Sequence, residues 1–314
     1  MVALLQAGGL LGGVLLVVAA TVHWRASGGP WPAVLALSPF LVPGLVIALE
    51  LICAALIVRR AYRGPRPPRW FWVRTWWVEW RLNLTVFAWR QPFAWRQLPD
   101  WSGAGSGRAP IVFVHGYLCN RGFWLPWLRM CRSVGRPYVT VNLEPMFASI
   151  DDYVPAIEAA VQRAKATTGC RPVLVGHSMG GLAIRAWIAS QSATHPRRWL
   201  ATVTLGSPHA GTWLARWSRT ANGRQMRQGS DWLAQLRERE AALGGAAPHK
   251  AFLCWASATD NVVFPAETAT LPGADNRWVA AAGHIELAYL PTVISTSLDW
   301  IASAERSPAA RTVS

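Results

Sequence analysis

The sequence is poor in lysine, in acidic residues and in charge generally. Two of its 31 basic residues are lysine, 16 residues are acidic, and charged residues make up 15% of a 314-residue chain that is 52% hydrophobic. A disordered polycation is excluded, because disorder requires low hydrophobicity. The net charge of +15 and the 20 tryptophans instead favour contact with a membrane surface or with nucleic acid.

Cysteine is scarce and scattered. The five cysteines are Cys53, Cys119, Cys131, Cys170 and Cys254. They are odd in number and show no metal-site spacing, so we expect a reducing compartment and neither a metal nor a cofactor. No nucleic-acid recognition motif accompanies the basic residues, so nucleic acid is not an expected partner.

Charge is absent from the first apolar run, Val2–Val22, which as a helix would cover about 30 Å, the thickness of a bilayer core. The second run, Trp31–Val58, carries only Glu50. We predict two transmembrane helices, about 2–22 and 35–58, within a membrane anchor of residues 1–58. A cleaved signal peptide is the alternative for the first run. For Glu50 we favour a carboxylate that snorkels toward, or pairs near, the arginines after the second run.

Residues 59–108 form a juxtamembrane segment and linker rich in arginine and tryptophan. Five arginines directly follow the second apolar run: Arg59, Arg60, Arg63, Arg66 and Arg69. By the positive-inside rule, we expect both termini and the chain after the second run to lie in the cytoplasm, with a short hairpin loop outside. Arg69–Arg90 is predicted to be a helix, lying in the lipid headgroup layer or packed on the domain that follows.

From residue 109 the chain alternates short apolar runs with longer helical stretches. Strands are predicted at Ile111–His115, Tyr138–Asn142, Val173–Gly176, Leu200–Leu205, Ala251–Ala256 and Arg277–Ala281, and helices at about 121–134, 150–168, 179–191, 230–243 and 285–304. This alternation predicts an α/β domain, residues 109–304, with a mostly parallel sheet covered on both faces. Its sites are expected at the carboxyl ends of the strands. The tail 305–314 is predicted to be disordered.

The motif Gly176-His177-Ser178-Met179-Gly180 lies between a predicted strand and a predicted helix. A sharp turn in this context exposes the serine hydroxyl, and the flanking glycines avoid collisions with neighbouring elements. The sequence therefore predicts Ser178 as a nucleophile.

A serine nucleophile requires a base and an acid, which follow it in the order acid, then histidine. Asp260 follows a predicted strand, and His284 is the only histidine after it. We expect His284 to take the Ser178 proton while Asp260 orients the imidazole. The backbone N–H groups of Met179 and Tyr117 are the expected oxyanion-hole donors. His115 is expected to order the loop that carries Tyr117.

Five segments in order, VFVHGYLCN, VGHSMGG, LGSPHAGT, TDNVVFP and AGHIEL, resemble the α/β-hydrolase superfamily, most of all its bacterial triacylglycerol lipases and carboxylesterases. The resemblance covers about residues 109–304. It implies the same triad and oxyanion hole. Together with the two apolar runs, the bacterial likeness leads us to expect a location in the bacterial inner membrane. The superfamily often inserts a cap after its sixth strand, and residues 207–249 are expected to be such a lid, mostly helical.

These features predict a serine hydrolase that cleaves lipid-like or apolar acyl esters at an anionic membrane surface. Two alternatives stay open. An acyltransferase would use the same triad to pass the acyl group to an acceptor other than water, and a thioesterase would use it on a thioester. A non-catalytic membrane-surface protein would use only the scaffold.

Overall fold

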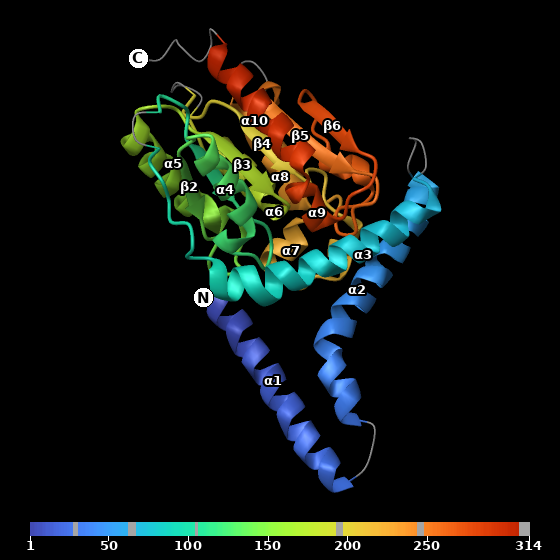
Figure 1. The fold of residues 1–314 in the computed structure, drawn as a ribbon. Helices are drawn as coiled ribbons and strands as arrows, with labels where there is room; N and C mark the ends of the chain where they lie inside the picture. Colours follow the sequence, from blue (N-terminus) through green and yellow to red (C-terminus); the bar gives the residue numbers. More distant parts are fainter. Residues whose placement is uncertain (28–30, 62–66, 104–105, 193–196, 244–247, 308–314) are drawn as a thin grey trace.

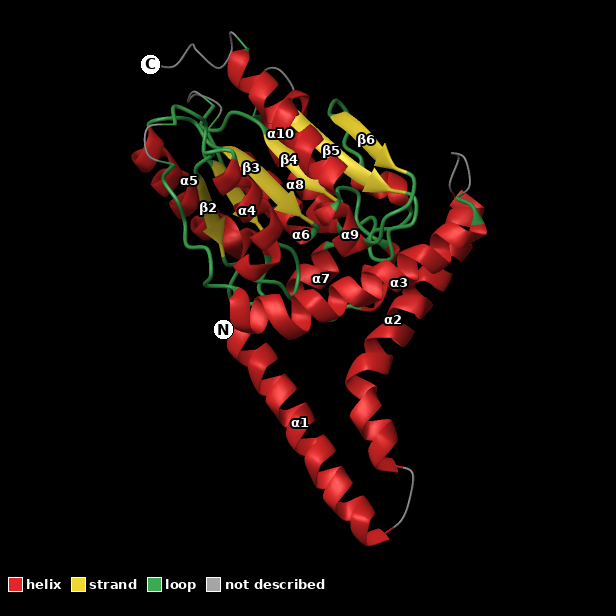
Figure 2. Ribbon diagram, in the orientation of Figure 1, coloured by secondary structure: helices red, strands yellow, loops and turns green. Residues whose placement is uncertain are grey.

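The computed structural model describes residues 1–27, 31–61, 67–103, 106–192, 197–243 and 248–307. Within them, six strands form one parallel sheet in the order β2-β1-β3-β4-β5-β6 (Figure 1, Figure 2). The strands are β1 (Ile111–Val114), β2 (Tyr138–Val141), β3 (Val173–His177), β4 (Thr202–Leu205), β5 (Phe252–Ser257) and β6 (Asp275–Val279). The strand order reverses beside β1, which is where parallel sheets form their sites.

Helices cover both faces of this sheet. Side chains alternate along β1: Val112 and Val114 join one core cluster, whereas Ile111 and Phe113 join the other. The first cluster contains α5 (Val154–Thr168), α6 (Met179–Ala189) and α8 (Asp231–Ala242), and the second contains α4 (Leu125–Ser133), α9 (His284–Tyr289) and α10 (Pro291–Arg306). Burial on both sides explains why the strands are continuous apolar runs.

The α/β pattern predicted from the sequence is confirmed, with each strand boundary within two residues of its expected place. The predicted helix 285–304 is divided into α9 and α10. Leu290 is extended (φ −60°, ψ 124°) and stands before Pro291. Proline disfavours the helical conformation in the residue that precedes it and lacks the N–H that would continue the helix.

Two long apolar helices project from the sheet domain. α1 (Val2–Ser27) and α2 (Trp31–Ala61) form the arms of a V, with the sheet domain at its wide end (Figure 1). Their segments Val2–His23 and Leu37–Val58 have mean hydropathy of 2.2 and 2.6 and are long enough to cross a membrane. Only 12% and 28% of these segments is buried. Their length and composition permit two membrane spans.

α3 (Arg69–Thr85) lies across the wide end of the V, beside the sheet domain, and continues as η1 (Val86–Ala94) (Figure 1). The helix predicted for Arg69–Arg90 is therefore present, and its contacts with α9 show that it packs on the domain. The arginines at positions 63 and 66 lie outside the described residues.

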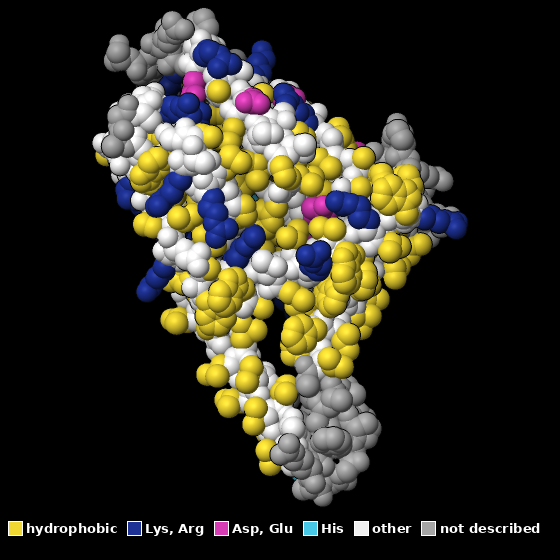
Figure 3. All heavy atoms as spheres, viewed as in Figure 1, with side chains coloured by type: hydrophobic (Ala, Val, Ile, Leu, Met, Phe, Trp, Pro, Cys, Tyr) yellow, Lys and Arg dark blue, Asp and Glu magenta, His cyan; other side chains and the backbone are white. Residues whose placement is uncertain are grey.

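The polarity of α3 is the reverse of that of a soluble amphipathic helix. Thr75 and Glu79 are fully buried, whereas Trp70, Val73 and Trp77 are 62%, 68% and 48% exposed. Hydrophobic side chains gather over this part of the surface and along α1 (Figure 3). Such an outward apolar face is what a helix at a lipid interface presents.

The insertion of residues 207–249 lies between β4 and β5 of the described sheet. It contains η4 (Trp213–Trp217), α7 (Ala221–Gln225) and α8. Glu240 of α8 forms a buried ion pair with Arg185 of α6 (2.7 Å). α8 therefore packs into the helical layer, and the earlier part of the insertion lies nearer the predicted site.

The C-terminal tail starts later than predicted. α10 continues to Arg306, and Glu305 forms an ion pair with Arg136 (2.7 Å) and accepts the backbone N–H of Ala109. Residues 308–314 lie outside the described residues.

Candidate functional site

Ser178 occupies the sharp turn between β3 and α6. Its backbone (φ 54°, ψ −130°) lies in a left-handed region that costs a non-glycine residue about 1–3 kcal/mol. A Cβ on Gly176 would lie 2.7 Å from the Gly181 nitrogen, and one on Gly180 would lie 2.2 Å from the Val114 oxygen. The tight turn therefore needs glycine at both positions, and it holds Ser178 at the N-terminus of α6.

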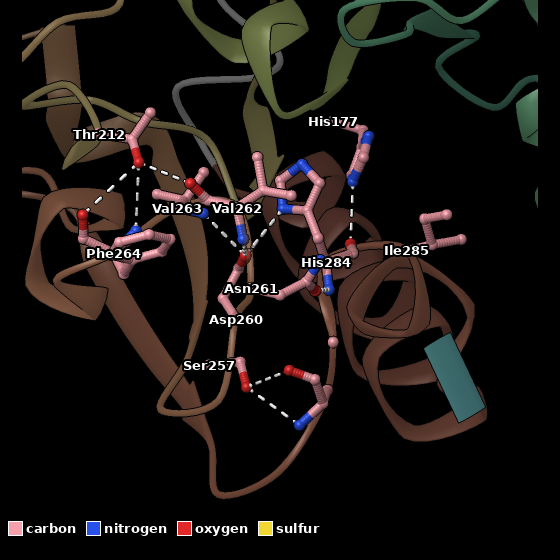
Figure 4. A network of polar contacts seen from close by, with 12 residues as sticks. His177, Thr212, Ser257, Asp260, Asn261, Val262, Val263, Phe264, His284 and Ile285 are labelled. Atoms are coloured by element: carbon pink, nitrogen blue, oxygen red, sulfur yellow. Dashed lines mark hydrogen bonds and ion pairs between the residues drawn. The ribbon is translucent and has the colours of Figure 1, made fainter. Parts of the chain in front are cut away.

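Asp260 and His284 follow β5 and β6, and the structure brings them together (Figure 4). His284 Nδ1 is 3.0 Å from Asp260 Oδ2 and 3.1 Å from Oδ1. The backbone N–H groups of Val262 and Val263 each donate to Asp260 Oδ1 at 2.8 Å, which fixes the carboxylate. With Nδ1 donating to Asp260, Nε2 is the His284 atom that can accept a proton.

The pKa values of the two histidines beside Ser178, His284 and His177, are shifted in opposite directions. Burial lowers the pKa of His284, but the charge and hydrogen bond of Asp260 outweigh it, so the pKa is raised above its ordinary 6.5. Burial and the nearby His284 hold the pKa of His177 well below 6.5. Neutral His177 directs Nε2 at the His284 carbonyl oxygen (3.0 Å, Figure 4). Only His284 is therefore suited to carry a proton.

The loop after β1 brings Tyr117 to the same place. A Cβ on Gly116 would lie 2.7 Å from Ser178 Cβ, so the loop passes directly against the serine. Leu118 has φ 59°, a second left-handed residue in this region. Met179, which opens α6, and Tyr117 thus both lie close to Ser178, where oxyanion donors are required.

His115 orders this loop, as predicted. Its Nδ1 donates to the Gly116 oxygen (2.9 Å), and its Nε2 accepts the Leu143 N–H (3.1 Å). Burial lowers the pKa of His115 to about 4, so the ring stays neutral. His115 is therefore a positioning group rather than a second base.

The apolar helix α2 reaches the site through Glu50. Glu50 Oε2 accepts a hydrogen bond from Asn261 Nδ2 (2.7 Å), and Asn261 Oδ1 accepts the His284 backbone N–H (3.0 Å). The interpretation of Glu50 as a carboxylate that pairs near the arginines is wrong, because its side chain is directed toward the triad residues.

Glu79 of α3 supports the same histidine from another side. It is fully buried, and its two oxygens accept the N–H groups of Ile285 (2.7 Å) and Glu286 (3.1 Å) at the start of α9. A Cβ on Gly283 would lie 2.3 Å from Glu79 Oε2, so the glycine makes room for the carboxyl. Arg74 adds a bidentate pair with Glu286 (2.6 and 3.0 Å).

Sequence reasoning missed Asn261, Glu79 and Arg74. The signal for Glu79 was present, since it is the only acidic residue in Arg69–Arg90. Its partner lies more than 200 residues away, however, and no periodicity indicates such a contact.

A cavity of about 490 Å³ contains both Ser178 and His284 in its wall. Much of its lining is apolar and comes from the sheet domain: Leu118, Phe123, Leu214, Val262 and Ile285. A smaller cavity of about 160 Å³ also reaches Ser178 and is lined by Leu214, Ala215 and Met226 of the insertion. Part of the insertion therefore lines the site, next to Ser178. Within the described residues, no group of three His, Cys, Asp or Glu side chains is placed to hold a metal.

Comparison with solved structures gives distant relatives. Bacillus licheniformis lipase BlEst2 in its mature form is similar at 17% identity and a TM-score of 0.53, over 65% of this chain and 94% of that one. Aspergillus fumigatus lipase B is similar at 14% identity and a TM-score of 0.52, over 66% and 57%. At such identities the likeness concerns the fold. No curated protein sequence matches the chain.

The model of the alpha/beta hydrolase family matches residues 111–310, almost two thirds of the chain. The match contains β1, the Ser178 turn and the loops that carry Asp260 and His284. The chain belongs to the alpha/beta hydrolase family.

Proposed function

We propose that this protein is a serine hydrolase that cleaves carboxylic esters with lipid-like or apolar acyl groups. The observation that carries the proposal is the convergence of three side chains. Ser178, on its strained turn, and His284 line one cavity, and His284 Nδ1 faces the Asp260 carboxylate. This arrangement is suited to acyl transfer through a covalent intermediate.

In the proposed reaction, Ser178 Oγ attacks the ester carbonyl carbon while His284 Nε2 takes the hydroxyl proton. The N–H groups of Met179 and Tyr117 stabilise the tetrahedral oxyanion. The intermediate collapses as the alcohol leaves with the proton from His284. Water, deprotonated by His284, then attacks the acyl-enzyme, and the acid leaves as the proton returns to Ser178. Asp260 stabilises the imidazolium in both steps.

An apolar acyl group is supported by the site and by its surroundings. The cavity lining is mostly apolar, and two distant structural relatives are lipases. α1 and α2 expose long apolar surfaces, and α3 presents tryptophans outward. We therefore infer that the two helices anchor the protein in the bacterial inner membrane, with α3 in the headgroup layer and the hydrolase domain in the cytoplasm. A reporter fused to the C-terminus tests this topology; activity in the periplasm would contradict it.

The proposed reaction is tested with full-length protein and p-nitrophenyl esters of graded chain length. We expect release of p-nitrophenol and free acid, and covalent labelling of Ser178 by a fluorophosphonate. A protein that consumes ester only when another alcohol is added would be an acyltransferase. Absence of labelling in detergent-activated protein would indicate a non-catalytic scaffold.

The pH dependence of hydrolysis follows from His284. The base must be neutral in the free enzyme, and its pKa is raised above 6.5. We therefore expect kcat/KM to rise with pH through an acidic limb whose midpoint lies above 6.5. Measurement of kcat/KM from pH 5 to 9 checks this. A midpoint below 6.5 would show that the Asp260 interaction does not govern the base.

A further inference from the structure

The cavity beside Ser178 is lined by α2, α3 and η1 as well as by the hydrolase domain. The N-terminal part of its lining consists of Val42, Pro43, Val46, Ile47 and Glu50 from α2, followed by Glu79, Asn83 and Phe87. Positions 43, 46, 47 and 50 follow a helical repeat, so one face of α2 forms a continuous wall. This wall belongs to the segment Leu37–Val58, which is long and apolar enough to span a bilayer.

Exposure changes along this wall. Ile47 is 3% exposed, whereas Val46 and Val42 are 47% and 54% exposed although they also line the cavity. The wall therefore runs from buried Ile47 to Val42 and Val46, which are exposed to the surroundings of α2. In a membrane-spanning α2, those surroundings are lipid chains.

Polar contacts hold α2 in this position. The indole N–H groups of Trp76 and Trp80 donate to the carbonyl oxygens of Gly44 and Phe40, each at 2.8 Å. Glu50 is bonded to Asn261, which in turn accepts the His284 N–H. The wall is thus fixed relative to the triad by hydrogen bonds at two levels of the helix.

We propose that α2 is a wall of the substrate site, and that the acyl chain of a lipid ester enters sideways from the bilayer past Val42 and Val46. The chain lies along Ile47 with its carbonyl carbon at Ser178. This inference rests on the proposed esterase function and adds where the acyl chain binds. The cavity along α2 is about three times as large as the one under the insertion, 490 against 160 Å³, which favours it as the acyl site.

The test compares Val46→Trp with a matched control, Leu45→Trp. Leu45 is the adjacent residue, 62% exposed and absent from the cavity wall. In full-length protein, we expect Val46→Trp to lower the ratio of kcat/KM for p-nitrophenyl palmitate to that for the acetate by about tenfold or more, since the indole narrows the entry. Leu45→Trp should leave this ratio within about twofold of wild type.

A ratio unchanged in Val46→Trp would overturn the inference while leaving the esterase proposal intact. The esterase proposal itself would fail in a different way: wild-type protein would show no Ser178-dependent hydrolysis of p-nitrophenyl acetate. A second measurement needs no variant. A long-chain fluorophosphonate with a diazirine in mid-chain should crosslink to residues 42–47; crosslinks confined to 212–226 would place the chain under the insertion instead.

Discussion

Ser178→Ala is expected to lower kcat/KM for p-nitrophenyl esters by about 10⁴-fold or more and to abolish fluorophosphonate labelling. The substitution removes the oxygen on which the proposed acyl-enzyme forms. The remaining groups still bind and polarise the ester, but water must attack directly. Rates of p-nitrophenol release and labelling with a fluorescent probe measure both effects.

Ser207→Ala is the matched control for this loss. Ser207 is also fully buried and lies against the same turn, since a Cβ on Gly181 would be 2.1 Å from its Oγ. Its hydroxyl has no hydrogen-bond partner among the described residues, so its removal should change kcat/KM by less than about threefold. Hydrolysis that persists in Ser178→Ala at more than a few per cent of wild type would assign the activity to another nucleophile.

Glu79→Ala is expected to have the second largest effect, on stability and on catalysis together. The variant leaves the N–H groups of Ile285 and Glu286 without their acceptor, and each unsatisfied buried donor costs about 1–3 kcal/mol. α9 begins at His284, so its displacement also moves the base. We expect a lower melting temperature and a fall in kcat rather than a rise in KM.

The pH dependence of stability reports on the protonation of the Glu79 carboxyl. Burial raises its pKa from 4.5 to about 8, although two backbone N–H groups oppose the shift. Between these values the folded protein holds a proton that the unfolded chain has released, so stability falls as pH rises from about 4.5 to 8. The full effect is on the order of 5 kcal/mol, for a shift of about 3.5 pKa units at about 1.4 kcal/mol each.

Glu79→Gln, which keeps the volume but cannot titrate, should therefore lack this part of the pH slope. Thermal melts of wild type and Glu79→Gln at pH 5, 6.5 and 8 measure the difference. The same change at exposed Glu238 is the control and should leave the slope as in wild type. Parallel melting curves for wild type and Glu79→Gln would show that the carboxyl does not carry a raised pKa.

The sheet was predictable from the sequence because parallel strands buried on both faces must be continuous apolar runs. The runs that became β1 and β3 are of this kind. The proposed triad was predictable for a related reason. The Ser178 turn needs glycine at two defined positions, and Asp260 and His284 each follow a strand, so local sequence and chain order suffice.

The contribution of the N-terminal helices to the site was not predictable in this way. An apolar run specifies a helix and its length, but it does not specify which face meets another domain. Glu50 was therefore assigned to the nearest arginines in sequence, whereas its partner Asn261 lies 211 residues away. The sequence of Arg69–Arg90 likewise predicted a helix in the headgroup layer or packed on the domain, without indicating that its polar face is the buried one.

The inward polar face of α3 has a consequence for how the chain can be divided. The family match begins at residue 111, yet Glu79 and Glu50 lie before it, and so does Gln91, whose side-chain and backbone oxygens hold Asn120 at the end of the β1 loop (2.9 Å each). A protein cut at the family boundary would lose acceptors for α9 and for that loop. We therefore expect that the hydrolase fold here is not a transferable module, and that grafting it onto another anchor would require new helices that supply the same three side chains.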